Sequence, residues 1–250
     1  MKMLRSILLV LGIALVSLTL PSCLKDDNSY SLGDMWIAIA TVVPQNDNSY
    51  YLRLDDGKKL WPAASNYPNY EPKADQRAFI NFTILSDSTQ GFAHYIKVNA
   101  IHNILTKPIA ENKGAENDSY YGIDPLTIPS KEDIWVGDGY LNVYFMTSWG
   151  GVKAHFINLI QTDAATNPYE LEFRHNAYDD PKVTVGSSRV AFNLSSLPDT
   201  KGETVDLKIK VWTLNGIETY TVKYNTDKEK LSASKTSVSD ESVTNMENIK

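Results

Sequence analysis

Residues 205–222 read VDLKIKVWTLNGIETYTV and give the clearest structural signal in the chain. Apolar side chains occupy every second position from Val205 to Val211, which is the pattern of a strand with one buried face. Asn215-Gly216 then separates this run from a second β-rich run, and this dipeptide predicts a hairpin closed by a type I′ turn. The stretch therefore predicts antiparallel β structure.

The same alternation recurs through the second half of the chain. Turn-forming residues separate the alternating runs, and no helical period lies between them. Short strands at this spacing predict an immunoglobulin-like β-sandwich over residues 130–225. The expected strands contain Leu141 to Phe145, His155 to Leu159, Leu171 to Phe173, Val190 to Phe192, Val205 to Val211 and Tyr220 to Val222.

The first half also predicts strands. Asp55-Asp56-Gly57 separates two β-rich runs and predicts a hairpin. In the last run the apolar phase shifts, which predicts a β-bulge near Asn99, while Pro62 to Pro72 is expected to be a loop. Five strands without a helix predict a small OB-like barrel over residues 35–110. The expected strands are Trp36 to Val43, Tyr50 to Leu54, Lys58 to Trp61, Ala78 to Leu85 and His94 to Leu105.

Three segments lack a strand pattern. Residues 23–34 form a short acidic tether, and residues 111–129 form a polar stretch that we interpret as a linker between the two domains. Residues 226–250 contain no aromatic side chain and consist mostly of polar residues. Such a segment buries too little surface to offset its ordering entropy, so it is predicted to be a disordered tail.

The N-terminus has the pattern of a secretory signal. Lys2 and Arg5 precede an apolar run from Ile7 to Leu20, which ends at Pro21. A transmembrane helix needs roughly 20 predominantly apolar residues, so this run is short for a membrane span. Residues 1–22 are therefore predicted to be a cleaved signal peptide.

Leu20-Pro21-Ser22-Cys23 resembles the lipobox of bacterial lipoproteins, although Pro21 departs from its commonest pattern. The resemblance implies cleavage before Cys23 and acylation of that residue, for example with palmitate, so that the chain is anchored in a membrane by lipid. Lys25, Asp26 and Asp27 resemble the signal that exports Bacteroidota lipoproteins to the outer face of the outer membrane. The alternative interpretation of these three residues is a solvated tether.

Charge and cysteine content narrow the function classes. The formal net charge is −6, and removal of residues 1–22 takes away two positive charges and no acid, which makes it −8. Nucleic acids are bound by concentrated Lys and Arg, so this acidic chain is not expected to bind them. Cys23 is the single cysteine, so the mature chain is expected to depend on packing instead of a disulfide.

Two stretches carry a resemblance to the NigD-like family of Bacteroidota lipoproteins. They are Tyr30-Ser31-Leu32-Gly33-Asp34 before Trp36, and Leu171-Glu172-Phe173-Arg174-His175-Asn176 in the second half. The resemblance implies an N-terminal OB-like domain and a C-terminal β-sandwich. It also implies a role like that of an immunity protein against a bacteriocin, and it supplies no catalytic residues.

The titratable residues do not form a recognisable catalytic or metal-binding pattern. The four histidines lack metal-ligand spacing, and His155 and His175 share strand faces with apolar residues, so both are expected to be partly buried and hydrogen-bonded. Acidic pairs such as Asp55-Asp56 and Asp179-Asp180 are interpreted as turns and solvated charge. No Gly-x-Ser-x-Gly elbow exists. We therefore expect no metal, no cofactor and no enzymatic activity.

Aromatic residues offer the best candidate for a binding surface. Trp61, Tyr67 and Tyr70 recur within a predicted surface loop of the barrel, beside amide side chains. Aromatic rings supply contact area at low entropic cost, so this loop could bind a peptide or a glycan. In the alternative interpretation, Trp61 fills the barrel and the two tyrosines fix the loop. Trp149, before Gly150-Gly151, is a weaker candidate of the same kind.

Two hypotheses for the function follow. The first is a surface-anchored, non-enzymatic lipoprotein that binds a protein, peptide or glycan outside the cell, with immunity against a secreted toxin as one case. The second is an accessory glycan-binding lipoprotein of an outer-membrane uptake system, with the aromatic loop as its platform.

Overall fold

The computed structural model describes residues 33–88 and 90–227, which belong to one compact unit. The signal peptide, Cys23, Lys25, Asp26 and Asp27, and residues 228–250 lie outside the described residues, and their assignments stay predictions. Nearly all regular structure in the described ranges is β-strand. None of the helices in these ranges has the length and apolar character needed to cross a membrane.

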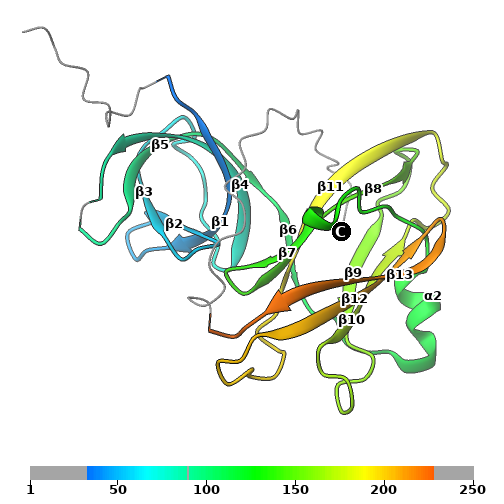
Figure 1. The fold of residues 1–250 in the computed structure, drawn as a ribbon. Helices are drawn as coiled ribbons and strands as arrows, with labels where there is room; N and C mark the ends of the chain where they lie inside the picture. The colour runs from blue at the N-terminus through cyan, green and yellow to red at the C-terminus, as the bar shows by residue number, and fades with distance from the viewer. Residues whose placement is uncertain (1–32, 89, 228–250) are drawn as a thin grey trace, which may run out of the picture. The chain divides into compact units, whose positions relative to one another are not determined.

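The N-terminal domain is a closed five-stranded barrel, which confirms the predicted OB-like architecture (Figure 1). Around the barrel the strands follow the order β1-β2-β3-β5-β4, with β4 returning to β1. Only the β3–β5 pair is parallel. The strands are β1 (Trp36–Pro44), β2 (Tyr50–Leu54), β3 (Lys59–Ser65), β4 (Gln76–Ser86) and β5 (His94–Asn103).

Alternating apolar residues fill the barrel. On β4 they are Ile80, Phe82 and Ile84, and each lies in the same core cluster as Ile96 and Val98 of β5. The residues between them point outward, because successive side chains on a strand face opposite sides. The period seen in the sequence is therefore the inside–outside pattern of the barrel wall.

Two irregularities shape the wall. Ala100 pairs with Asn81 and Val98 pairs with Phe82, so Asn99 is an extra residue on β5 and the predicted bulge is confirmed. The predicted loop is shorter than expected, because β3 continues through Pro62 to Ser65. Its register with β5 shifts just after Pro62, and proline is tolerated in a strand at such an irregularity.

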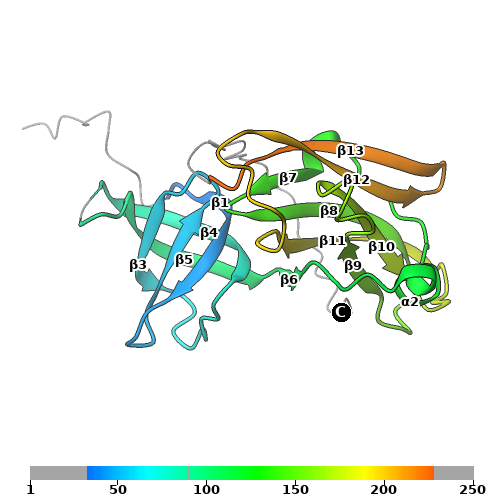
Figure 2. The same ribbon diagram turned by 90° about the horizontal axis from the view of Figure 1, so that it is seen from below.

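The C-terminal domain is a β-sandwich of two four-stranded sheets, as predicted (Figure 2). One sheet has the order β13-β12-β10-β9 and the other has the order β6-β11-β8-β7, and their inner faces share one core cluster. The strands are β6 (Leu105–Pro108), β7 (Ile134–Gly137), β8 (Tyr140–Trp149), β9 (Phe156–Ile160), β10 (Glu170–Asn176), β11 (Thr184–Asn193), β12 (Val205–Thr213) and β13 (Gly216–Tyr224).

Residues 111–129 were predicted to be a linker between the domains. In the structure they are instead packed as part of the sandwich. They contain the short helix α2 (Asn117–Tyr121), and Leu126 and Ile128 belong to the sandwich core. The preceding strand β6 already pairs with β11. The apolar side chains of this segment are spaced irregularly among polar ones and give no periodic signal. For this reason their packing into the sandwich could not be predicted from the sequence.

The hairpin turns also correct one prediction. Thr213 pairs with Gly216, so the central residues of the turn are Leu214 and Asn215. Neither has a positive φ, so this turn is not type I′, which needs positive φ at both central residues, and the positive φ of 105° lies at Gly216 after them. The sequence between β7 and β8 does meet that requirement, with Asp138 at φ 47° and Gly139 at φ 84°. The dipeptide that forms the type I′ turn is therefore Asp138-Gly139.

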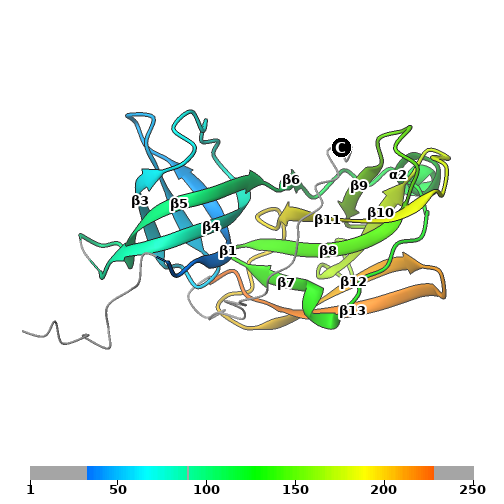
Figure 3. The same cartoon turned by 90° about the horizontal axis from the view of Figure 1, so that it is seen from above.

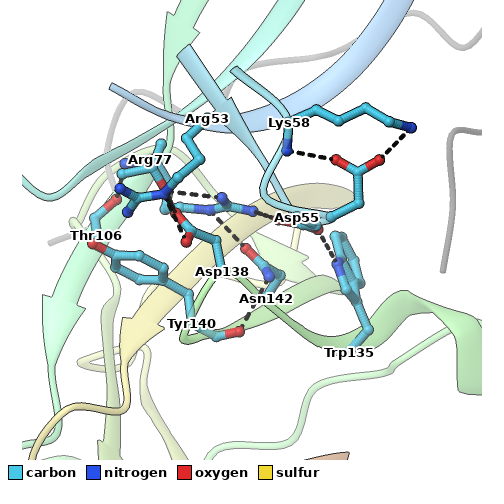
Figure 4. Close-up of polar contacts among 11 residues, drawn as sticks. Arg53, Asp55, Lys58, Arg77, Thr106, Trp135, Asp138, Tyr140 and Asn142 are labelled. Atoms are coloured by element: carbon cyan, nitrogen blue, oxygen red, sulfur yellow. Dashed lines mark hydrogen bonds and ion pairs between the residues drawn. The ribbon is translucent and has the colours of Figure 1, made fainter. Parts of the chain in front are cut away.

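A buried polar network joins the barrel to the sandwich (Figure 4). Arg77 on β4 has no exposed surface. Its guanidinium forms an ion pair with Asp55, donates to Thr41 Oγ1 at 3.0 Å and donates to Asn142 Oδ1 on β8 at 3.3 Å. Its Cζ lies 5.3 Å from the ring centroid of Tyr140. The charge of Arg77 is thus paired with a carboxylate of the barrel, and the sandwich adds an amide acceptor and an aromatic ring.

Asp55 and Asp138 complete the network. The indole Nε1 of Trp135 on β7 donates to Asp55 Oδ2 at 2.9 Å. Asp138 Oδ2 accepts from Thr41 Oγ1 at 2.5 Å. Asp55 was interpreted as turn and solvated charge, and the structure corrects this, because its carboxylate is largely buried and takes part in two contacts of the junction.

Candidate functional site

The three aromatic residues of the predicted loop do not form one platform. Tyr67 is 41% exposed, whereas Tyr70 packs against Tyr50 with ring centroids 5.3 Å apart and donates to Asn103 Oδ1 at 2.7 Å. Burial, and then the neighbouring Tyr50, raise the pKa of Tyr70 to about 12. Trp61 is half-buried and lies on β3. Tyr70 therefore fixes the loop, as the alternative interpretation proposed for it, and Trp61 and Tyr67 remain partly accessible.

Trp61 belongs instead to a cluster of four rings on the outer wall of the barrel, which we call the aromatic face: Tyr51, Trp61, Phe92 and Tyr95. The Phe92 centroid lies 5.2 Å from that of Trp61, 5.9 Å from that of Tyr51 and 6.2 Å from that of Tyr95. All four side chains are partly exposed. The aromatic face is thus a contiguous surface of rings.

Strand register explains why these rings meet. Trp61 and Tyr95 are directly paired on the parallel strands β3 and β5. Their neighbours Leu60 and Ile96 point into the barrel, so both rings must point outward. Tyr51 precedes the interior residue Leu52 on β2, and Phe92 comes from the loop before β5.

Polar groups surround the aromatic face. Lys59 Nζ lies 5.6 Å from the ring centroid of Tyr51, and Tyr95 Oη donates to Gln90 Oε1 at 3.0 Å. Rings beside an amide and an ammonium group suit ligands that present both an apolar face and hydrogen-bonding groups.

Sequence reasoning identified Trp61 and missed its three partners. Tyr51 and Tyr95 lie at outward positions of strands, where a single aromatic residue needs no functional explanation. Phe92 lies in a short loop beside Gly91. The available signal was the alternation itself, which placed Tyr51, Trp61 and Tyr95 on the outer wall without giving the register that brings them together.

Trp149 ends β8, pairs with Thr184 of β11 and is half-buried. The two glycines after it are explained by Asp180. The backbone N–H groups of Gly150 and Gly151 donate to Asp180 Oδ2 at 2.5 and 3.2 Å, and a Cβ at Gly150 would lie 2.3 Å from the carbonyl oxygen of Pro181. Gly150-Gly151 is thus a loop anchor, and Trp149 lies apart from the aromatic face.

The two histidines on apolar strand faces are buried, as predicted, and they contact each other. His155 Nδ1 and His175 Nε2 lie 2.9 Å apart, and His155 Nε2 lies 3.4 Å from Asp180 Oδ2. When His155 Nε2–H donates to Asp180, the Nδ1 of His155 is left to accept from His175 Nε2–H. Burial, together with His155, lowers the pKa of His175 to about 4.

Asp180 corrects the interpretation of Asp179-Asp180 as solvated charge. Its side chain has no exposed surface, and its carboxylate accepts four backbone N–H groups, from Gly150 to Lys153, at 2.5 to 3.2 Å. Burial raises the pKa of Asp180, but the hydrogen bonds from Gly150, Lys153, Val152 and His155 outweigh it and lower the pKa to about 2. Asp180 and the histidines form a structural anchor.

His94 and His102 belong to the barrel. His94 Nδ1 lies 3.2 Å from the carbonyl oxygen of Ser86, and His102 is exposed on β5. Within residues 33–88 and 90–227, no group of three or more His, Cys, Asp or Glu side chains is arranged to hold a metal ion.

The Leu171–Asn176 motif is explained by packing on both faces of β10. Leu171, Phe173 and His175 point into the sandwich. Arg174 lies on the opposite, outer face of β10, where other side chains bury it. There Arg174 forms ion pairs with Glu172 and with Asp118 of α2, and its Cζ lies 3.9 Å from the ring centroid of Trp212. The motif thus fixes the segment that contains α2 onto the sheet.

Comparisons with known proteins cover both domains. The NigD-like N-terminal OB domain matches residues 39–104, and the NigD-like C-terminal beta sandwich domain matches residues 108–224. Among proteins with curated functions, none matches the chain.

Solved structures resemble the chain over nearly their whole length. A protein of Parabacteroides distasonis described as toxin-related is 68% identical, with a TM-score of 0.76 over 79% of this chain and 97% of its own. A protein of Bacteroides vulgatus of unknown function is 28% identical, with a TM-score of 0.67 over 81% and 96%. A NigD-like immunity protein of Bacteroides caccae shares the fold at 20% identity, with a TM-score of 0.58 over 80% and 100%. With both domains matched in order, the chain belongs to the NigD-like family.

Proposed function

We propose that this chain is an exported lipoprotein that binds a partner outside the cell and has no enzymatic activity. The aromatic face carries the proposal, because four partly exposed rings from three strands and a loop form a continuous surface. The strongest candidates for acid–base catalysis, His155 and His175, are each only 1% exposed, so they cannot reach a substrate as the protein stands.

The proposed anchor is Cys23, within Leu20-Pro21-Ser22-Cys23. Acyl chains contribute about 0.8 kcal/mol per buried methylene, and more than one chain makes membrane attachment stable. Lys25, Asp26 and Asp27 would direct the protein to the outer face of the outer membrane. This position would bring the aromatic face into contact with molecules outside the cell.

The first candidate role is protection against a secreted toxin. The family name supports it, and so does the shared fold of the Bacteroides caccae protein described as an immunity protein. The test compares a deletion strain with its parent during growth beside toxin-secreting relatives. We expect the deletion strain to be sensitised, and we expect complementation to fail with Cys23→Ala or with Trp61→Ala/Tyr95→Ala. Unchanged sensitivity of the deletion strain would exclude this role.

The second candidate role is glycan binding, favoured by the rings of Trp61 and Tyr95, which both contact Phe92, and by the amide of Gln90 beside Tyr95. OB barrels bind oligosaccharides on this part of their surface, and the acidic charge argues against oligonucleotides. A glycan array probed with the chain lacking residues 1–23 tests it. Binding should be lost in Trp61→Ala and retained in Tyr67→Ala, the matched control outside the aromatic face. Equal binding by both variants would exclude the aromatic face as the glycan site.

A further inference from the structure

One arginine at the junction between the domains lacks a carboxylate partner. The other arginines in the described ranges, Arg53, Arg77 and Arg174, each form an ion pair with a carboxylate. The side chain of Arg189 on β11 forms no ion pair and no hydrogen bond within residues 33–88 and 90–227. Its positive charge therefore has no oxygen acceptor from the protein.

Two aromatic rings hold this guanidinium in place. The Cζ of Arg189 lies 4.7 Å from the ring centroid of Tyr144 on β8 and 5.3 Å from that of Phe79 on β4. Tyr144 belongs to the sandwich and Phe79 to the barrel, so both domains position the arginine. The rings attract the charge but supply no oxygen, so the N–H donors keep their capacity to bind a carboxylate. None of the guanidinium nitrogens is fully buried.

Strand register adds a histidine to this place, which we call the Arg189 corner: Phe79, His102, Tyr144 and Arg189. Arg189 is directly paired with Tyr144. Phe79 is directly paired with His102 on β5. The residues beside them along each strand lie in the two domain cores, so all four side chains point outward. β5 leads into β6, which pairs with β11 and so brings the barrel pair next to the sandwich pair (Figure 3).

The polar groups of the Arg189 corner are accessible. His102 is exposed, and the other three side chains are partly exposed. Neither the imidazole of His102 nor the Oη of Tyr144 forms a hydrogen bond in the described part of the chain. The corner thus presents a guanidinium, an imidazole and a phenol beside two aromatic rings.

Acidic side chains are absent from the strands around the corner. The chain contains 30 acidic residues, yet β4, β5, β6, β8 and β11 contain no Asp or Glu. The acids just outside these strands have contacts of their own: Asp75, before β4, contacts a tyrosine hydroxyl, and Glu132, before β7, contacts a serine hydroxyl. Neither they nor Asp133 forms an ion pair with Arg189. A carboxylate from a ligand would therefore meet an uncompensated positive charge.

A uronate sugar fits this combination of groups. Arginine binds a planar carboxylate through two parallel N–H···O bonds. In a uronate the carboxylate is attached directly to a pyranose ring, whose apolar face can pack on an aromatic ring and whose hydroxyls can bond to imidazole and phenol groups. The carboxylate of an Asp or Glu side chain is attached to methylenes and offers neither a ring nor hydroxyls.

We propose that the Arg189 corner binds the carboxylate and the adjoining ring of an acidic sugar. This site is separate from the aromatic face. It goes beyond the proposed function, because it needs neither the immunity role nor a ligand on the aromatic face. The two sites are also tested separately, since neutral glycans on an array report on the aromatic face and lack the carboxylate that Arg189 requires.

Isothermal titration calorimetry on the chain lacking residues 1–23 tests the proposal. The probes are trisaccharides of galacturonate, glucuronate and mannuronate, each compared with its methyl ester, which keeps the sugar ring and loses the charge. At least one acid should bind, and its ester should bind roughly tenfold more weakly or worse.

Variants locate the binding site of that acid. Arg189→Gln should lower the affinity by roughly tenfold or more, and Arg189→Lys, which keeps the charge without the planar fork, should lower it less. Lys59→Gln is the matched control, because it removes a positive charge beside the aromatic face, and it should bind normally. Thermal melts check that the variants are folded.

A second measurement uses the wild-type chain and does not depend on a folded variant. Butanedione modifies accessible guanidinium groups, and mass spectrometry of the digested chain gives the extent of reaction at each arginine. The bound uronate should slow the reaction of Arg189, and the methyl ester should not. Arg53, whose side chain is 27% exposed, is the internal control and should react at the same rate throughout.

Four results would each overturn the proposal. The first is that no acid binds more tightly than its ester. The second is that Lys59→Gln loses the affinity and Arg189→Gln keeps it, which would assign the acid to the aromatic face. The third is that free acetate binds as tightly as the uronates, so that no sugar ring is recognised. The fourth is that triglutamate binds as tightly, which would assign the corner to an acidic protein.

Discussion

Arg53 of the barrel and Asp138 of the sandwich form an ion pair, with Arg53 Nε 2.8 Å from Asp138 Oδ1. Asp138 is the first of the two central residues of the type I′ turn between β7 and β8, and its side chain is only 2% exposed. A turn residue with positive φ thus also supplies a buried carboxylate to the junction between the domains. This position combines a backbone requirement with an electrostatic one.

A double-mutant cycle on this pair measures the coupling between the domains. We expect Asp138→Ala to lower the free energy of unfolding by roughly 2–3 kcal/mol, because it leaves polar partners unsatisfied. Arg53→Met should cost less, since the Arg53 side chain is 27% exposed. The coupling energy should be about 1 kcal/mol, obtained from urea denaturation of all four proteins. Strictly additive effects would contradict the contact.

Arg77→Met should be the most damaging single change at the junction. It leaves Asp55 without its cationic partner and removes donors to Thr41 and Asn142. Breaking a buried ion pair costs about 3–5 kcal/mol. Chemical denaturation should show this loss, and Arg189→Met, another arginine stacked on aromatic rings, is the control expected to cost less. Equal losses in the two variants would show that the network adds nothing beyond packing.

His175 should make the sandwich sensitive to mild acid. Its pKa is lowered to about 4 in the folded protein, from an ordinary value of 6.5, so the unfolded chain binds the proton first as the pH falls. Stability is therefore fully present above about pH 6.5 and is lost progressively toward pH 4. Between pH 7 and pH 5 the loss should be about 2 kcal/mol.

Urea denaturation across this pH range checks the prediction for His175. In His175→Gln the pH dependence should flatten, whatever the absolute stability of the variant. His102→Gln, at an exposed histidine, should keep the wild-type slope. A wild-type slope in both variants would show that another group controls the acid response.

Cys23→Ala should release the protein from the membrane. Without the thiol there is no site for the first acyl chain, so the protein should move from the membrane fraction to the soluble fraction. Metabolic labelling with a palmitate analogue should mark the wild-type chain and not the variant. Retention of the variant in the membrane would show that another segment provides the anchor.

The sequence predicted the individual strands well, but it predicted the turn types and the ends of the strands less well. The alternation from Val205 to Val211 became β12, and the phase shift near Asn99 became a bulge. The turn at Asn215-Gly216 was assigned the wrong type, because the same dipeptide fits more than one hairpin geometry. Pro62 remained within β3 because an irregular register freed its position from the hydrogen-bond ladder.

In the candidate site, too, single residues were predicted from the sequence, whereas their contacts with distant residues were not. Trp61 was recognised as an aromatic residue of the barrel, but its contact with Phe92 depends on where the loop before β5 folds back. His155 and His175 were expected to be buried, and their mutual contact arises from the pairing of β9 with β10. Asp180 was taken for a solvated acid, since nothing nearby in the sequence reveals that it accepts bonds from residues 150–153.

By itself, the sequence determined that this chain is made of strands in two domains, because the burial of alternate side chains leaves a period of two wherever a strand forms. Only the tertiary structure decided which outward rings gather into the aromatic face and which charges meet at Arg77 and Asp55. The physical reason is range: alternation is fixed within a few residues, whereas strand register and loop packing are set by contacts between distant segments.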